Sequence, residues 1–166
     1  GSESTAVMVF DLNNLRIIND RQGHERGDQY IRSFAEQLRV ALPEKYFVGR
    51  DGGDEFIAVL KQVDHEQVKD CLQMIREQTE RYSKNHPDML LSYAVGYALS
   101  TDFPGSNMKD LFRYADKNMY VDKNRAKMKE AADKRRLRSR LLQSVKEKGF
   151  HFTDCLYCDA IVDQYV

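Results

Sequence analysis

The sequence has few cysteines, no excess charge of either sign and no long apolar run. Cys71, Cys155 and Cys158 are too few for a disulfide framework and suit a reducing compartment. The 26 basic and 26 acidic residues cancel, so the overall charge does not favour nucleic acid or an acidic membrane surface as a partner. No run approaches the roughly 20 apolar residues of a membrane span. We therefore expect a cytoplasmic fragment with no nucleic-acid or membrane contact, any membrane tether lying outside this sequence.

The length suits one domain with an appendage. A chain of 166 residues can bury a sizeable core. After Lys127 helix-forming residues continue while the apolar stripe thins. A helix from 107 to 148 would be about 60 Å long, more than a small domain covers. We expect a domain at residues 1–128 and a helical extension or linker of unknown role at 129–166.

The first half of the chain predicts a buried strand and an amphipathic helix. Residues 6–10 form an unalternating, valine-rich run, as in a strand covered on both faces, and Asp11 follows at its C-terminal end. Apolar residues recur at spacings of three and four over 25–41, which predicts a helix that Pro43 ends.

A hairpin and three further elements are expected next. The runs 45–50 and 55–60 are joined by residues that accept positive φ, so they predict a hairpin with Asp54 at its tip. A helix capped by Asp64, a strand over 89–99 and a helix capped by Ser106 follow. The order β-α-β-β-α-β-α predicts an α/β sandwich, with a central mixed sheet covered by helices.

Two carboxylates are candidates for one site. Asp11 ends a strand and Asp54 follows the hairpin turn, so the two side chains meet if the hairpin lies beside that strand. Hard oxygen ligands suit Mg²⁺, which usually binds through one or two carboxylates together with substrate phosphates. The pattern therefore points to a metal-bound nucleoside triphosphate.

Three motifs together resemble one family. Residues 52–56 read GGDEF, the signature of the GGDEF family of diguanylate cyclases. Residues 10–28 are similar to that family's first motif, and residues 114–127 are similar to its last helix. The matches cover roughly residues 6–127 in the expected order, which makes coincidence very improbable.

The resemblance implies a palm-like domain of the nucleotidyl cyclase type. Such a domain binds GTP and, as a two-fold homodimer, condenses two GTP into cyclic di-GMP with release of two pyrophosphates. The implied cofactor is Mg²⁺ or Mn²⁺, and sensory domains are expected elsewhere in the full-length protein. The implied metal ligands are Asp11, the Leu12 carbonyl, Asp54 and Glu55, and Asp54 and Glu55 are also the implied catalytic pair.

The resemblance also implies how GTP is held. Asp28 and Asn19 would recognise guanine, because an ionised carboxylate accepts both its N1–H and its 2-amino group, whereas adenine presents an acceptor at N1. The residues implied at the rest of the nucleotide, chiefly its phosphates, are Lys123 and Lys127, one helical turn apart, the backbone of Asn14 and Leu15, and Gly52 and Gly53 of the signature.

Several positions depart from the family pattern. Asn13 stands where a second aspartate is usual, which removes a negative charge near the metal. Arg16 replaces a lysine, and Lys127 replaces an arginine and so loses its bidentate fork. The family's N-terminal helix and its closing strand are missing. Pro43 and Tyr46 replace the arginine and aspartate of a product-inhibition site, so we expect no such feedback.

Simpler interpretations compete with these roles. The sequence DGGD alone favours a polar turn, and Asn19 and Asp28 can simply punctuate a loop containing Gly23 and Gly27. Cys155 and Cys158, with one histidine nearby, are too few ligands for zinc. At the level of function, the alternatives are a degenerate domain that binds GTP as a regulatory or dimerisation module, and a cyclase of relaxed base choice.

Overall fold

The computed structural model describes residues 4–149. Contacts divide the chain into two units, one ending at Lys123 and the other beginning at Asn124. The expected domain boundary at residue 128 stays a prediction.

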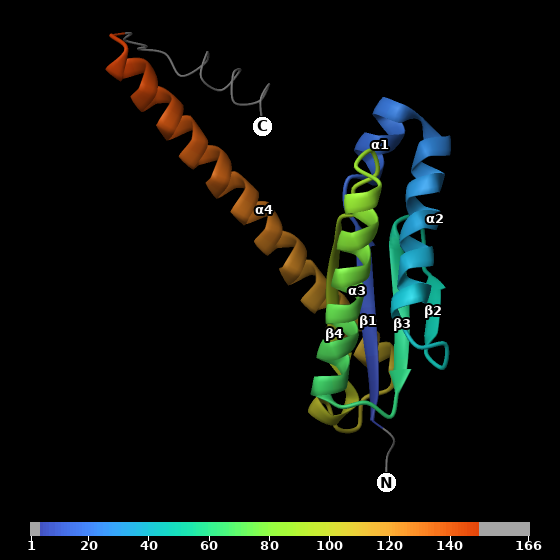
Figure 1. Ribbon diagram of the computed structural model, residues 1–166. Helices are drawn as coiled ribbons and strands as arrows, with labels where there is room; N and C mark the ends of the chain where they lie inside the picture. The colour runs from blue at the N-terminus through green and yellow to red at the C-terminus, as the bar shows by residue number, and fades with distance from the viewer. Residues whose placement is uncertain (1–3, 150–166) are drawn as a thin grey trace. The chain divides into compact units, whose positions relative to one another are not determined.

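The first unit is built on a four-stranded sheet. Its strands are β1 (Thr5–Leu12), β2 (Phe47–Arg50), β3 (Glu55–Lys61) and β4 (Tyr93–Leu99), in the order β2-β3-β1-β4 (Figure 1). The predicted hairpin is confirmed as β2 and β3.

Strand direction corrects one expectation. Every neighbouring pair among the described strands is antiparallel, so the sheet is not mixed. The reason lies in the two helical crossovers, from β1 to β2 and from β3 to β4. Each crossover joins two strands that are separated by a third, and the intervening strand runs the opposite way.

Residues 4–149 also contain four α-helices. They are α1 (Leu15–Gln22), α2 (His24–Ala41), α3 (His65–Asn85) and α4 (Met108–Glu147), and a 3₁₀ turn, η1 (Ser100–Asp102), follows β4. In Figure 1, α2 and α3 lie side by side on one face of the sheet. The predicted α/β sandwich of helices on a central sheet is confirmed.

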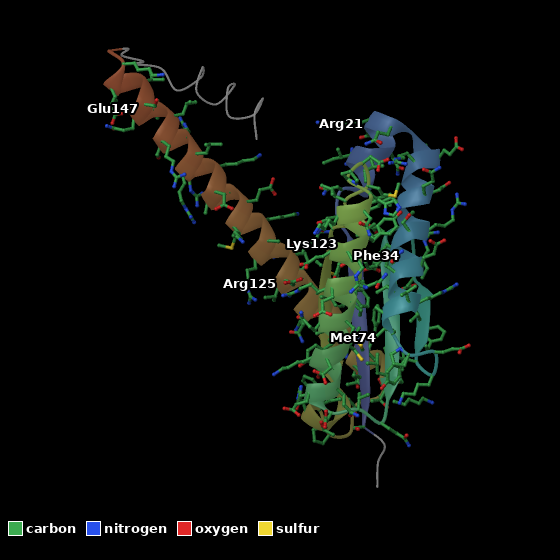
Figure 2. All side chains as sticks on the ribbon, in the orientation of Figure 1. Arg21, Phe34, Met74, Lys123, Arg125 and Glu147 are labelled. Carbon is green, nitrogen blue, oxygen red and sulfur yellow. The ribbon has the colours of Figure 1, made fainter. Side chains whose placement is uncertain are left out.

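Strand β1 is covered on both faces, as its unalternating apolar run predicts. Met8 and Phe10 belong to the core under α2 and α3, where Phe34 points toward the sheet (Figure 2). Val7 and Val9 belong to a second core under the first turns of α4. Since side chains alternate along a strand, Asp11 follows Val7 and Val9 onto the α4 face.

Some predicted details are corrected. Strand β4 begins at Tyr93 rather than Met89. The side chain of Asn107, not Ser106, accepts the backbone N–H of Asp110 at the start of α4. The Asp64 capping box of α3 is confirmed.

The loop of the simpler interpretation, containing Gly23 and Gly27, is not observed, whereas the predicted helix over 25–41 is confirmed as α2. Gly23 has φ 89° and alone separates α1 from α2, so Asn19 lies on α1 and Gly27 and Asp28 lie on α2.

In the second unit, residues 124–147 belong to α4, and most side chains of this range are exposed. Cys155 and Cys158 lie outside the described residues. Within residues 4–149, none of the helices combines the length and apolar character that crossing a membrane requires.

Candidate active site

Asp11 and the hairpin tip are joined through the sheet. The Leu12 N–H donates to the Asp54 carbonyl at 2.8 Å, and Asp11 lies directly opposite Glu55 in the β1–β3 register. Directly opposed residues point to the same face of a sheet. The hairpin therefore lies beside β1, as the two-carboxylate prediction requires.

The turn that carries Asp54 depends on a glycine and on Arg50. Gly52 has φ 83°, a conformation that costs glycine little and other residues more. The Arg50 guanidinium donates to the carbonyl oxygens of Gly52 and Gly53, with Nη2 2.8 Å from the Gly53 oxygen. Arg50 thus braces the loop, a role that the sequence patterns did not reveal.

The carboxylates share an environment that opposes their ionisation. Burial and then the charge of Asp11 raise the pKa of Asp54. Burial and then the charge of Asp116, on α4, raise the pKa of Glu55. Negative charge is therefore concentrated at this end of the sheet, where a bound cation would be stabilised.

Lys123 meets this cluster from α4. Its ammonium donates to Asp11 Oδ2 at 2.6 Å, and this hydrogen bond raises the pKa of Lys123. Asp11 is 8% exposed, and its second oxygen, Oδ1, is buried without a hydrogen-bond partner. A buried carboxylate oxygen without a partner costs free energy, so Asp11 has one acceptor to offer to a further cation.

The position of Lys123 depends on Gly96 of β4. A Cβ built on Gly96 would lie 2.0 Å from the Met119 backbone nitrogen, so only glycine lets α4 approach the sheet this closely. Two side chains of α4 secure the contact: Asn118 donates to the Tyr97 carbonyl, and Asp122 accepts the Val95 N–H. Lys123 follows Asp122 directly.

The donor set fits a hard divalent cation. Asp11 and Asp54 supply carboxylate oxygens, and the Asp11 Oδ1 atom lacks a partner. Within residues 4–149, no group of three or more His, Cys, Asp or Glu side chains is arranged to bind a metal ion through protein ligands alone. Mg²⁺ usually keeps few protein ligands and completes its shell with water and substrate phosphates.

The two residues expected at guanine lie near each other. Asn19 of α1 packs against Gly27 of α2 so closely that a Cβ on Gly27 would lie 1.8 Å from Asn19 Oδ1. Asp28 is the next residue along α2 and is exposed. The Asn19 and Asp28 side chains therefore come from two helices, α1 and α2, which are in contact at Gly27.

Asn14 and Leu15 stand at the start of α1, just after β1. Asn14 is exposed and has φ 69°. Asn13 turns its amide to Ser92, with 3.1 Å between Nδ2 and Oγ, and the Tyr30 hydroxyl donates to the Asn13 carbonyl at 2.9 Å. The residue that replaces the family's second aspartate is thus engaged with the start of β4.

A match to a family model completes this picture. Residues 1–129 match the family described as diguanylate cyclase, GGDEF domain. The chain belongs to this family. Its matched region contains the GGDEF sequence at 52–56 and the carboxylate site built around it.

Individual relatives agree with the family match. The GGDEF domain is 33% identical over 129 residues to the signaling protein YkoW of Bacillus subtilis (strain 168), and covers 76% of this chain and 16% of that protein. It is 26% identical over 130 residues to an uncharacterized membrane protein of Staphylococcus aureus (strain USA300), covering 76% of this chain and 36% of that protein. The chain thus spans well under half the length of these relatives.

Solved structures agree on the fold. The GGDEF domain of TpbB, also called YfiN, from Pseudomonas aeruginosa superposes with a TM-score of 0.65 at 29% identity, covering 74% of this chain and 73% of that one. The GGDEF domain of DgcB from Caulobacter crescentus, solved in complex with c-di-GMP, gives a TM-score of 0.64 at 24% identity, covering 74% and 73%. At that identity the second likeness shows the fold alone.

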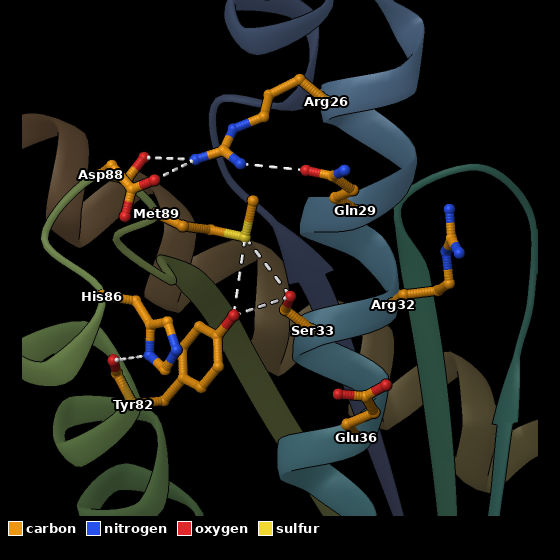
Figure 3. A pocket seen from close by; sticks show the side chains of 9 residues that line it. All are labelled: Arg26, Gln29, Arg32, Ser33, Glu36, Tyr82, His86, Asp88 and Met89. Carbon is orange, nitrogen blue, oxygen red and sulfur yellow. Dashed lines mark hydrogen bonds and ion pairs between the residues drawn. The ribbon is translucent and has the colours of Figure 1, made fainter.

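A separate pocket of about 260 Å³ lies between α2 and the C-terminal end of α3 (Figure 3). Arg26 forms an ion pair with Asp88 at 2.8 Å, and the Tyr82 hydroxyl donates to Ser33 at 2.9 Å. None of the residues predicted for the GTP site lines this pocket. These polar contacts join α2, the helix of Asp28, to α3 through Tyr82 and to the segment after α3 through Asp88.

Besides the role of Arg50, two features of the GGDEF domain's site were missed by sequence reasoning. The first is Asp116, whose charge acts on Glu55 and which lies in the motif 114–127 without an assigned role. The second is the pairing of Lys123 with Asp11, 112 positions apart. Lys127 is exposed in the second unit, and its phosphate role stays a prediction.

Proposed function

We propose that this domain is a diguanylate cyclase that condenses two GTP into cyclic di-GMP and releases two pyrophosphates, using Mg²⁺ or Mn²⁺ across a homodimer. The observation that carries the proposal is the interaction of Asp11 with both Asp54 and Glu55 at one end of the sheet, with a buried acceptor oxygen on Asp11. Family membership supports the same reaction.

The metal would be held by Asp11, the Leu12 carbonyl, Asp54 and Glu55. When bound, the cation lowers the cost of forming the attacking 3′-alkoxide and neutralises charge on the α-phosphate and the leaving pyrophosphate. Asp54 would also help to accept the proton of the 3′-hydroxyl, with Glu55 beside it.

Cationic and backbone donors would hold the triphosphate. Lys123 supplies an ammonium group at the carboxylate cluster, and Lys127 is the second proposed cation. The N–H groups of Asn14 and Leu15, at the start of α1, would donate to phosphate oxygens, because the first N–H groups of a helix have no partner within it. Gly52 and Gly53 would allow the chain to approach the nucleotide without a side chain in the way.

Guanine would be selected by Asn19 and Asp28. The Asp28 carboxylate accepts from N1–H and the 2-amino group, and the Asn19 amide both donates and accepts. The closeness of Asn19 to Gly27 supports a single binding surface between α1 and α2.

One observation favours a second candidate function, that of a domain that binds GTP without turning it over. Asn13 carries no charge and its amide is engaged with Ser92, so it adds nothing to metal binding. Such a domain would serve as a regulatory or dimerisation module. Calorimetry that detects GTP binding without product formation would establish this alternative.

The proposed reaction is tested by pyrophosphate release from GTP at high protein concentration. We expect release to require Mg²⁺ or Mn²⁺ and to stop in Asp54→Asn. Metal-independent release, or unchanged release by Asp54→Asn, would contradict the proposal.

A further inference from the structure

Lys123 and Asp11 form a contact that the proposed reaction must break. Their Nζ and Oδ2 atoms are 2.6 Å apart, and the two side chains are 28% and 11% exposed. The proposed function assigns Asp11 to the metal and Lys123 to the triphosphate. Without these ligands the two residues satisfy each other, so both must change partner when metal and nucleotide bind.

The ion pair with Lys123 satisfies only one of the two carboxylate oxygens of Asp11. The ammonium covers Oδ2, whereas Oδ1 is buried without a hydrogen-bond partner as long as the neighbouring Asp54, which can bond to Asp11 only when one of the two carboxyls is protonated, is ionised. The ammonium group carries one positive charge and contacts only one oxygen of the carboxylate. A divalent cation carries two charges and can be approached by both oxygens, so the ammonium group does not fully replace it. The carboxylate is therefore neutralised while its second oxygen stays available.

The charges around Lys123 determine how easily a second cation can bind beside it. Lys123 interacts with Asp54 and Glu55 as well as with Asp11. A divalent ion that enters beside the ammonium meets like-charge repulsion in a largely buried place, where screening by solvent is weak. A triphosphate brings the negative charge that offers Lys123 another partner.

We propose that Lys123 is a surrogate cation, which neutralises Asp11 in the ligand-free domain and passes to the triphosphate when metal and GTP arrive together. The inference rests on the proposed function and adds to it an energetic coupling between the two ligands. Coupling is reciprocal, so GTP raises metal affinity by the same factor by which metal raises GTP affinity. The domain thereby discriminates against metal without nucleotide.

The test removes the charge of Lys123 and measures metal binding without turnover. Lys123→Gln keeps a hydrogen-bond donor for Asp11 but carries no charge, whereas Lys123→Arg keeps the charge. Lys117→Met removes a charge from an exposed position of the same helix and serves as the matched control. Mn²⁺ binding is measured by electron paramagnetic resonance, with and without 3′-deoxy-GTP, which lacks the attacking hydroxyl.

Without nucleotide, we expect Lys123→Gln to bind Mn²⁺ about tenfold more tightly than the parent, a difference of about 1.4 kcal/mol. Lys123→Arg and Lys117→Met should bind like the parent. With 3′-deoxy-GTP, the gain in Mn²⁺ affinity should be smaller in Lys123→Gln than in the parent. Equal or weaker nucleotide-free Mn²⁺ binding by Lys123→Gln would overturn the inference.

The outcomes separate this inference from the proposed function. If the parent binds Mn²⁺ and 3′-deoxy-GTP but Lys123→Gln changes neither affinity nor coupling, only the surrogate role is wrong. If the parent binds no Mn²⁺ even with the nucleotide, the proposed function and the inference are both wrong.

A measurement on the unsubstituted protein covers the case in which Lys123→Gln does not fold. Nitrogen-15 NMR of the lysine ammonium groups, with the Lys123 signal assigned through Lys123→Arg, reports the partner of that group. We expect the signal to shift on addition of Mg²⁺ with 3′-deoxy-GTP and to stay in place with Mg²⁺ alone at the same concentration. A signal that stays in place in both additions would overturn the inference.

Discussion

Gly96 of β4 and Met119 of α4 lie backbone against backbone, since a Cβ on Gly96 would come within 2.0 Å of the Met119 nitrogen. A backbone contact cannot relax by turning a side chain, so Gly96→Ala must push α4 away from the sheet. We expect the free energy of unfolding to fall by about 3 kcal/mol, the upper end for overpacked sites. Urea unfolding measures the change. Gly53→Ala, where a Cβ meets nothing within 4 Å, is the control, and equal stability of the two variants would contradict the packing argument.

The metal-free domain should become more stable when Asp54 loses its charge. Burial and the charge of Asp11 raise the pKa of Asp54, so folding favours the neutral carboxyl. The penalty for ionisation is complete above the raised pKa and is lost as the pH falls from that pKa to the ordinary value of 3.8. We expect Asp54→Asn to raise the Tm at pH 7 by about 2–4 °C in the presence of a chelator.

The same comparison at low pH checks the sign. The gain of Asp54→Asn should shrink through the acid range and vanish below pH 3.8, where the parent carboxyl is neutral in both folded and unfolded states. Asp70→Asn, at an exposed position of α3, should leave the Tm nearly unchanged. A lower Tm for Asp54→Asn at pH 7 would show that its charge stabilises the metal-free fold, against this account.

Asp28 should determine base choice. A carboxylate that accepts from both N1–H and the 2-amino group distinguishes GTP from ITP, which lacks that amino group. We expect Asp28→Ser to lower kcat/KM for GTP by about tenfold to a hundredfold, the range for hydrogen bonds to a charged group. Its preference for GTP over ITP should largely disappear. Asp20→Ser, on an exposed position of α1, is the control, and an unchanged preference in Asp28→Ser would contradict the assignment.

Turnover should depend on protein concentration. Each subunit of the proposed dimer contributes one GTP, so a single subunit holds only half of the reacting atoms. We expect specific activity to fall steeply on dilution, in step with dimer dissociation followed by analytical ultracentrifugation. Constant specific activity across the dissociation range would contradict a site shared by two subunits.

Local patterns predicted most of the fold. The unalternating run at 6–10 predicted a strand buried on both faces, and Asp51-Gly52-Gly53 predicted the hairpin, because both depend on neighbours in sequence. The all-antiparallel sheet was not predicted, since it depends on which strand inserts between β1 and β2. The cap at Asn107 was placed one residue early, because serine and asparagine are both good N-cap residues.

For the candidate site, the sequence named individual residues but indicated few of the contacts between them. Asp11 and Asp54 were expected to meet if the hairpin lay beside the first strand, because Asp11 ends that strand and Asp54 follows the hairpin turn. The Lys123–Asp11 pair joins positions 112 apart, and nothing in a helical stripe indicates which lysine reaches a distant strand. For Asn13, the sequence indicated only the loss of a negative charge near the metal. Its hydrogen bond to Ser92 was not predicted, because it depends on how β4 packs.

The central claim is that carboxylates from two strands hold a divalent cation against GTP for nucleotidyl transfer. Its most direct test is mass identification of the products after incubation of the domain with GTP and Mg²⁺, with Asp54→Asn in parallel. The account predicts cyclic di-GMP from the parent, with two pyrophosphates released for each molecule formed, and no product from Asp54→Asn. Recovery of unchanged GTP from a parent protein that binds it, or cyclic di-GMP from Asp54→Asn, would contradict the account.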